Sequence, residues 1–160
     1  MSVSITDALT GLYNRLKIDQ YLIQKKADFD RYESPSSIIL LDIDYFKHIN
    51  DDFGHQVGDK VLIEFSNILK ENIRETDLLG RWGGEEFLII CPNTQKNEAL
   101  VLAKKLLREV RNHSFSKVGN LTFSAGVSAF NNDDSINETI SHADKALYQS
   151  KRNGRNQASL

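Results

Sequence analysis

Apolar residues recur along the chain with two periods, one helical and one typical of strands. Helical spacing predicts four helices, at residues 13–31, from 58 or 59 to 74, 96–112 and 136–152. Shorter apolar runs predict strands at residues 37–44, 78–82, 88–91 and 121–130, with a short edge strand at 113–116. This order of strands and helices is compatible with an α+β domain, in which helices pack against a central sheet.

The strand at residues 37–44 holds five apolar residues in nearly continuous order, which indicates burial on both faces. It ends in Asp42 and Asp44, and buried strands tend to deliver polar groups where the chain emerges into a cleft. We expect Asp44 to cap the helical turn that follows. That turn would offer free backbone N–H groups to a phosphate, and Lys47 would add a positive charge there.

A second acidic segment lies in a predicted hairpin. Gly83 and Gly84 are expected to supply the positive φ of a tight turn, and Glu85 and Glu86 then open the return strand with side chains on opposite faces. Taken alone, this stretch is also compatible with an ordinary solvated hairpin. The first strand supplies the other acidic arm, because Asp42 and Glu85 at the ends of adjacent core strands are hard oxygen ligands suited to Mg²⁺.

Asn50 and Asp59 carry groups that can reach the Watson–Crick edge of a base. One carboxylate can accept both N–H donors of a guanine. In the alternative interpretation, Asn50, Gly54 and Gly58 belong to a loop, and Asp59 caps the next helix.

Two pairs of charged residues have no clear role from their spacing alone. Lys151 and Arg155 flank the end of the last helix, for which Gly154 is the expected C-cap, and they could contact helix carbonyls or reach a phosphate. Arg74 and Asp77 precede the hairpin, and such a pair carries little meaning without context.

Composition narrows the class of protein. The 160 residues suffice for one domain with a hydrophobic core, and 40% hydrophobic and 26% charged residues are typical of a soluble globular protein. A net charge of −2 with interspersed signs gives no electrostatic footprint for DNA or RNA. No apolar run reaches the length of a membrane span. Cys91, the one cysteine, is expected in the core, and its isolation fits a reducing cytoplasm.

Four segments together resemble the GGDEF family, the diguanylate cyclases, over nearly the whole chain. Residues 7–15 (DALTGLYNR) are similar to the family's DxLTxLxNR opening, and residues 42–51 (DIDYFKHIND) to its DxDxFKxIND block. Residues 54–59 (GHQVGD) resemble GHxxGD, and residues 83–87 match the GG[DE]EF signature in its GGEEF form. All four in this order and spacing are highly specific, so they favour the functional interpretations over the structural ones.

The resemblance implies a fold like the palm of nucleotidyl cyclases and polymerases, with a mainly antiparallel sheet of about five strands surrounded by helices. It also implies condensation of two GTP molecules to cyclic di-GMP, with release of two pyrophosphates. Two Mg²⁺ ions, or Mn²⁺ in their place, would stabilise the attacking and leaving oxygens.

Carried over by position, Asp42, Glu85 and the backbone carbonyl of Ile43 match the family's metal ligands. Glu85 also matches the proposed proton acceptor for the ribose 3′-OH, and whether it is a base or only a ligand stays open. The other positions match substrate contacts, namely Asn50 and Asp59 for guanine, His55 for a further contact, and Phe46, Lys47, Lys151 and Arg155 for phosphate.

Arg74 and Asp77 match the family's RxxD inhibitory site, which would bind the product cyclic di-GMP. Lys105 is the candidate for a third residue of this site, at a position where the family more often has Arg. Because Lys lacks the planar fork of Arg, we expect product inhibition to be present but weaker.

The resemblance places a single GGDEF catalytic domain at residues 1–160, without the sensor or receiver domain of many family members, and implies a cytoplasmic location. Each domain would hold one GTP, so catalysis would require a transient antiparallel homodimer. The alternatives are a non-catalytic receptor for GTP or cyclic di-GMP and a pure interaction domain.

Overall fold

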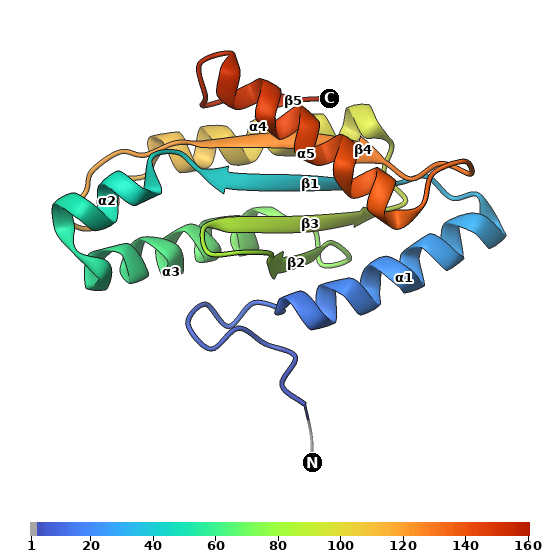
Figure 1. Ribbon diagram of the computed structural model, residues 1–160, viewed down its shortest axis with the longest axis horizontal. Helices are drawn as coiled ribbons and strands as arrows, with labels where there is room; N and C mark the ends of the chain where they lie inside the picture. The colour runs from blue at the N-terminus through green and yellow to red at the C-terminus, as the bar shows by residue number, and fades with distance from the viewer. Residues whose placement is uncertain (1–2) are drawn as a thin grey trace.

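The computed structural model describes residues 3–160, which form a five-stranded sheet with helices on both faces (Figure 1). The strands are β1 (Ser36–Ile43), β2 (Leu78–Arg81), β3 (Glu86–Pro92), β4 (Phe123–Ala129) and β5 (Ala158–Ser159). The helices are α1 (Arg15–Tyr32), α2 (Phe46–Phe53), α3 (His55–Asn72), α4 (Lys96–Asn112) and α5 (Ile136–Arg152). The predicted α+β class is therefore confirmed.

The sheet has the strand order β2-β3-β1-β4-β5. β1 pairs antiparallel with β3 on one side and with β4 on the other, and β2 pairs antiparallel with β3. Only the short β5 runs parallel to its neighbour, β4. β1 thus occupies the centre, and every one of its residues is buried, as its continuous apolar sequence predicts.

Alternation along β1 divides the interior into two apolar clusters, one on each face of the sheet. Ile39 and Leu41 pack with residues of α3 and α4. Ile38 and Leu40 pack with residues of α1 and α5. Figure 1 shows α5 crossing the sheet on one side and α4 lying on the other. Burial on both faces explains why the strand shows no polar alternation until its last residues.

The two ends of the described chain attach to opposite edges of the sheet. The segment before α1 joins the β2 edge, where the backbone N–H of Arg81 donates to the carbonyl of Tyr13 at 2.9 Å. The segment after α5 turns back and adds β5 to β4. No helix within residues 3–160 combines the length and apolar character needed to cross a membrane.

The strongly periodic helices have the predicted bounds, whereas several short elements differ. α4 and α5 begin and end where their apolar stripes and capping boxes indicate. α3 begins at His55, earlier than predicted, and ends at Asn72. The edge strand expected at residues 113–116 is reduced to one bridge between Phe115 and Gly119. The two-residue β5 was not predicted, because so short a strand has no period to detect.

Gly126 provides a test of how α5 packs on the sheet. A Cβ at this position would collide with backbone atoms of Ala143 and Leu147, which cannot yield as a flexible side chain would. We therefore expect Gly126→Ala to lower the free energy of unfolding by about 2–3 kcal/mol in urea denaturation.

Gly84→Ala is the matched control, because a Cβ there meets nothing within 4 Å and the backbone φ is not positive. It should change the free energy of unfolding by less than about 0.5 kcal/mol. Equal effects of the two substitutions would contradict the close packing of α5 on β4.

Candidate active site

The acidic ends of two central strands meet at one place. In the antiparallel register of β1 and β3, Asp42 lies opposite Glu86. One residue further along, the backbone N–H of Ile43 donates to the carbonyl of Glu85 at 3.3 Å. The expectation that Asp42 and Glu85 belong to the ends of adjacent core strands is confirmed, although Glu85 lies in the turn just before β3.

A cavity of about 320 Å³ lies beside this junction, between α2, α3 and the hairpin. Six of the predicted site residues line it together with Leu62, Arg81 and Gly84, namely Phe46, Lys47, Asn50, His55, Asp59 and Glu85. Residues from three separated segments therefore converge on one space. Its walls offer a phenyl ring, an imidazole, an amide, two carboxylates and two cationic side chains, which can recognise a polar ring and bind an anionic group.

Close packing of α2 on α3 shapes this cavity. Asp59 lies within α3 and does not cap it, and Gly58 is a helical residue, so the loop interpretation of these positions is wrong. A Cβ at Gly58 would overlap the side-chain oxygen of Asn50. The glycine therefore allows the two helices to approach until Asn50 and Asp59 share a wall of the cavity.

Asp42 faces the other side of the sheet and does not line this cavity. Lys151 donates from its Nζ to Asp42 Oδ2 at 2.7 Å. Burial raises the pKa of Asp42, the bond and charge of Lys151 act in the opposite sense, and the neighbouring charge of Asp44 raises the pKa further. Burial and the charge of Asp42 likewise raise the pKa of Glu86. Asp42 is thus a desolvated carboxylate with a single side-chain donor.

Asp44 does not cap the following helix, contrary to expectation. The N-cap of α2 is Tyr45, and no side chain caps that helix. The carboxylate of Asp44 instead accepts hydrogen bonds from Thr122 Oγ1 at 2.6 Å and Ser124 Oγ at 2.7 Å. It also accepts the backbone N–H of Asn156 at 3.0 Å. These partners come from the start of β4 and from the segment after α5.

The hairpin turn is held by an arginine side chain and by two backbone hydrogen bonds to the carbonyl of Glu86, and not by glycines with positive φ. Neither Gly83 nor Gly84 adopts a positive φ, so that expectation is wrong. Arg81 donates from Nη2 and Nε to the carbonyl of Gly84, at 2.8 and 3.1 Å. The side chain of Arg81 thus holds the turn that carries Glu85.

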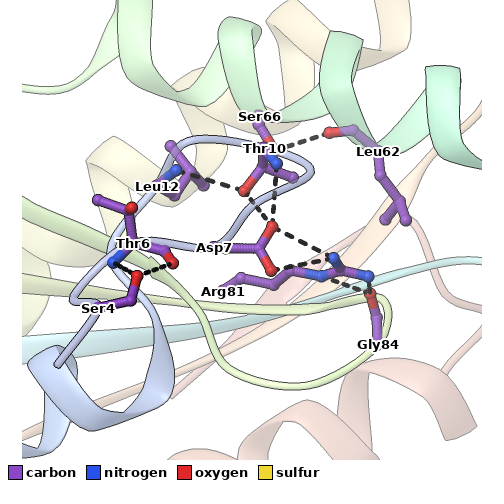
Figure 2. A network of polar contacts seen from close by, with 9 residues as sticks. All are labelled: Ser4, Thr6, Asp7, Thr10, Leu12, Leu62, Ser66, Arg81 and Gly84. Carbon is purple, nitrogen blue, oxygen red and sulfur yellow. Dashed lines mark hydrogen bonds and ion pairs between the residues drawn. The ribbon is translucent and has the colours of Figure 1, made fainter.

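Asp7 holds Arg81 in place from the segment before α1 (Figure 2). Its Oδ2 is 3.2 Å from Arg81 Nη1 and accepts hydrogen bonds from the backbone N–H and the hydroxyl of Thr10. Burial raises the pKa of Asp7, but the bonds from Thr10 and the charge of Arg81 outweigh it, so the pKa lies below its ordinary value. The opening motif is therefore linked to the hairpin through two side chains.

The donor set fits Mg²⁺ bound together with a phosphate ligand. Within residues 3–160, no group of three or more His, Cys, Asp or Glu residues is arranged to hold a metal by itself. Mg²⁺ in phosphoryl-transfer sites is commonly bound by one or two carboxylates, with phosphates and water completing the shell. The buried Asp42, together with Glu85 and the Ile43 carbonyl, can supply such a partial set.

The predicted inhibitory residues also converge. Arg74, Asp77 and Lys105 line a cavity of about 280 Å³ between the end of α3 and α4. Asp77 is buried, and its Oδ1 has no hydrogen-bond partner. Burial raises the pKa of Asp77, while the backbone N–H and the charge of Arg74 act in the opposite sense. A buried acceptor without a donor is costly, so this cavity is suited to a ligand that carries N–H groups.

The largest cavity described, about 790 Å³, lies along the outer edge of β4 and α5. It contains none of the predicted site residues, so size alone does not identify the site. Arg81 and Gly58 were missed as site-forming residues, although Gly58 lies within the GHxxGD motif and Arg81 lies two residues before the GGEEF signature. Their roles depend on contacts with Asp7 and Asn50 that neighbouring sequence does not reveal.

Comparison with known proteins gives a consistent result. A family model described as "Diguanylate cyclase, GGDEF domain" matches residues 4–157. The response regulator PleD of Caulobacter vibrioides is 40% identical over 164 residues, which covers 98% of this chain and 36% of PleD. The chain thus spans little more than a third of that relative's length.

Two solved structures are similar over nearly their whole lengths. The GGDEF domain of DgcB from Caulobacter crescentus, in complex with c-di-GMP, is 30% identical with a TM-score of 0.94, covering 99% of this chain and 96% of that one. The active GGEEF domain of a diguanylate cyclase from Vibrio cholerae is 37% identical with a TM-score of 0.87, covering 91% of this chain and 95% of that one.

The Asp7–Arg81 contact should contribute to stability in a pH-dependent way. The pKa of Asp7 is lowered by folding, so its carboxylate stabilises the folded state above the ordinary pKa, and this contribution is lost as pH falls through the folded-state value. We expect Asp7→Asn to lower the free energy of unfolding by about 1 kcal/mol near neutral pH.

Urea denaturation from about pH 7 down to about pH 2.5 measures this effect, and the difference from wild type should persist to about pH 4 and shrink below it. Asp19→Asn is the control, because Asp19 pairs with Arg15 in an exposed contact of 3.6 Å. A pH-independent loss for Asp7→Asn would rule out the charged contact as its cause.

Proposed function

Because the chain belongs to the GGDEF domain family of diguanylate cyclases, we propose that it condenses two molecules of GTP into cyclic di-GMP and releases two pyrophosphates. The observation that carries this proposal is the convergence of Glu85 with Asn50 and Asp59 on one cavity. An acidic residue beside a base-sized space with guanine-compatible groups is the arrangement that nucleotidyl transfer requires. A receptor or an interaction domain would not need all three.

In this proposal, the side of the cavity formed by α2 and α3 recognises guanine. The carboxylate of Asp59 can accept the N1–H and N2–H donors of guanine, and the amide of Asn50 can donate to an acceptor on the ring. Phe46 and His55 extend the same wall. An adenine would present a donor and an acceptor where guanine presents two donors, so this pairing favours GTP.

The triphosphate would extend from this cavity across the end of β1. Lys47 lines the cavity, whereas Lys151 and Arg155 lie beside Asp42 and Asp44 on the other side of the strand. Lys151 is paired with Asp42 in the free protein. We propose that Lys151 turns to the phosphates when the nucleotide binds and leaves Asp42 free to act as a ligand.

Asp42, Glu85 and the carbonyl of Ile43 are the proposed ligands for two divalent ions, Mg²⁺ or Mn²⁺. When bound, such ions neutralise charge on the attacking and leaving oxygens of the α-phosphate. Glu85 is also the proposed proton acceptor for the ribose 3′-OH. Its place in a turn held by Arg81 would orient the carboxylate before the substrate arrives.

Two copies of the domain are needed for a cyclic product. Each copy offers one cavity with guanine-compatible walls, and each 3′-OH must reach the α-phosphate of the other nucleotide. We propose a transient antiparallel homodimer with one GTP on each partner. The rate should then rise more steeply than linearly with protein concentration.

Arg74, Asp77 and Lys105 form the proposed site for feedback by cyclic di-GMP. Asp77 Oδ1 is a buried acceptor without a partner, and a guanine N–H group would satisfy it. Arg74 can contact a guanine or phosphate acceptor through its planar guanidinium. Lys105, which donates to the carbonyl of Asn72 at 3.3 Å, offers a single charge and no fork.

Turnover of GTP tests the proposed reaction. Concentrated protein incubated with GTP and Mg²⁺ should form cyclic di-GMP, measured by chromatography. Glu85→Gln keeps the shape of the side chain but removes its charge, and we expect it to lose activity by about 10²-fold or more. Glu109→Gln, an exposed position on α4, should retain the wild-type rate.

Absence of product from wild type, even at high protein concentration or in an enforced dimer, would contradict the cyclase. Binding of GTP or cyclic di-GMP without turnover would then favour a receptor.

Replacement of Arg74 tests the feedback site separately from the reaction. Arg74→Ala should relieve inhibition by added cyclic di-GMP while initial rates remain within about twofold of wild type. Lys105→Arg should act in the opposite direction and lower the concentration of product needed for inhibition. Arg108→Ala, an exposed neighbour on α4, serves as the control. Inhibition that persists unchanged in Arg74→Ala would exclude this assignment.

A further inference from the structure

We propose that Asp44 is a positioning residue that holds Arg155 in place for the triphosphate of GTP. The inference rests on the proposed function and adds a role for an acid that the metal assignment leaves unused. It depends on three observations: the three hydrogen bonds that Asp44 accepts, the unusual backbone after α5, and the placement of the Arg155 guanidinium.

The carboxylate of Asp44 is bound by donors of the protein itself. It is only 3% exposed, and Thr122, Ser124 and Asn156 donate to it at 2.6–3.0 Å. Arg155 Nη1 adds a positive charge 3.9 Å from Oδ1. Burial of a carboxylate is tolerated when hydrogen-bond donors and a nearby positive charge compensate for the lost water in this way. Asp42 has one side-chain donor, Lys151, and can exchange it for a ligand.

The segment after α5 adopts a conformation that needs external support. Gly154, Arg155 and Asn156 have φ values of +110°, +65° and +52°, so three consecutive residues lie in the left-handed region. For the two non-glycine residues this conformation is unfavourable. The N–H of Arg155 donates to the carbonyl of Ser150, and the N–H of Asn156 donates to Asp44. Asp44 is thus one of the contacts that hold this turn, together with the side chains of Gln157 and Arg111.

The turn determines where the side chain of Arg155 lies. Its guanidinium is 4.8 Å from the centroid of the Tyr45 ring and borders Asp44. The side chain is 34% exposed, so part of the guanidinium remains open to solvent. A planar group with five donors can rest on Asp44 with one edge and present another to a phosphate. Asp44 therefore orients Arg155 through both the backbone and the side chain.

Double-mutant analysis of nucleotide binding tests this inference. The probe is 3′-deoxy-GTP with Mg²⁺, which lacks the attacking hydroxyl, so its affinity can be measured by calorimetry without turnover. Asp44→Asn keeps the size of the side chain but loses the charge and an acceptor for the N–H of Asn156. We expect Asp44→Asn and Arg155→Ala each to weaken binding about tenfold.

The double variant distinguishes positioning from general damage. If Asp44 acts through Arg155, the double variant should bind about as weakly as Arg155→Ala alone, because the two losses share one contact. A merely structural role for Asp44 would give additive losses, about 100-fold in total. Ser37→Ala is the control: Ser37 is fully buried on β1, at the end remote from this site, and donates to the carbonyl of Thr94. It should bind 3′-deoxy-GTP like wild type.

Ser124→Ala provides a second route if Asp44→Asn does not fold. It removes one hydrogen-bond donor to Asp44 and leaves Asp44 and Arg155 in the chain, so binding of 3′-deoxy-GTP should weaken a few fold. When Arg155 is already replaced by Ala, adding Ser124→Ala should cause no further loss of affinity. Wild-type affinity in the Asp44 or Ser124 variants, or additive losses with Arg155→Ala, would overturn the inference. Failure of the wild type to bind 3′-deoxy-GTP would instead overturn the proposed function, and the inference with it.

Discussion

Burial of the central strand on both faces is the constraint from which the site follows. β1 lies between β3 and β4 and is covered by helices on either side, so polar groups can appear only where it ends. The acids that appear there are largely removed from water, and each charge needs a partner from the protein or from a ligand. Asp44 is supplied with donors by the protein, whereas Asp42 has Lys151 alone. The difference between the two acids thus comes from their surroundings and not from their chemistry.

Elements with a strong period could be predicted from the sequence. α4 and α5 have broad apolar stripes, and α5 begins with a capping box formed by Ser135 and Glu138. At the start of α4, the side chain of Glu98 accepts the backbone N–H of Gln95 at 2.9 Å. Local sequence carries all of that information. The start of α3 could not be predicted, because glycine is typical of loops and the close approach of Gly58 to Asn50 is visible only in the structure. β5 exists only through its partner strand, and two residues contain no pattern of their own.

In the candidate site, too, local motifs could be recognised in the sequence, whereas contacts between distant residues could not. The resemblance to the GGDEF family indicated which side chains would line a site, and the cavity beside the hairpin contains six of them. The sequence did not indicate that Asp42 turns away from this cavity, because strand register decides that. Nor could it assign the partners of Asp44, which lie 78, 80 and 112 residues further along the chain. A capping role was predicted for Asp44 because Asp is a preferred N-cap residue and a helix follows directly.

Two loops at opposite edges of the sheet are each held by a carboxylate that accepts hydrogen bonds and lies next to an arginine. Asp7 accepts a backbone N–H and a hydroxyl from Thr10 and pairs with Arg81, which holds the turn of Glu85. Asp44 accepts a backbone N–H and two hydroxyls and borders Arg155. In each case a carboxylate orients an arginine that local sequence would leave free. Side-chain exposure is 21% for Asp7 but 1% for Asp44, so water can partly replace the partners of the first and not those of the second. The hydrogen bonds that Asp44 accepts should therefore be the more rigid of the two sets, and they hold the loop that carries Arg155, the proposed phosphate contact.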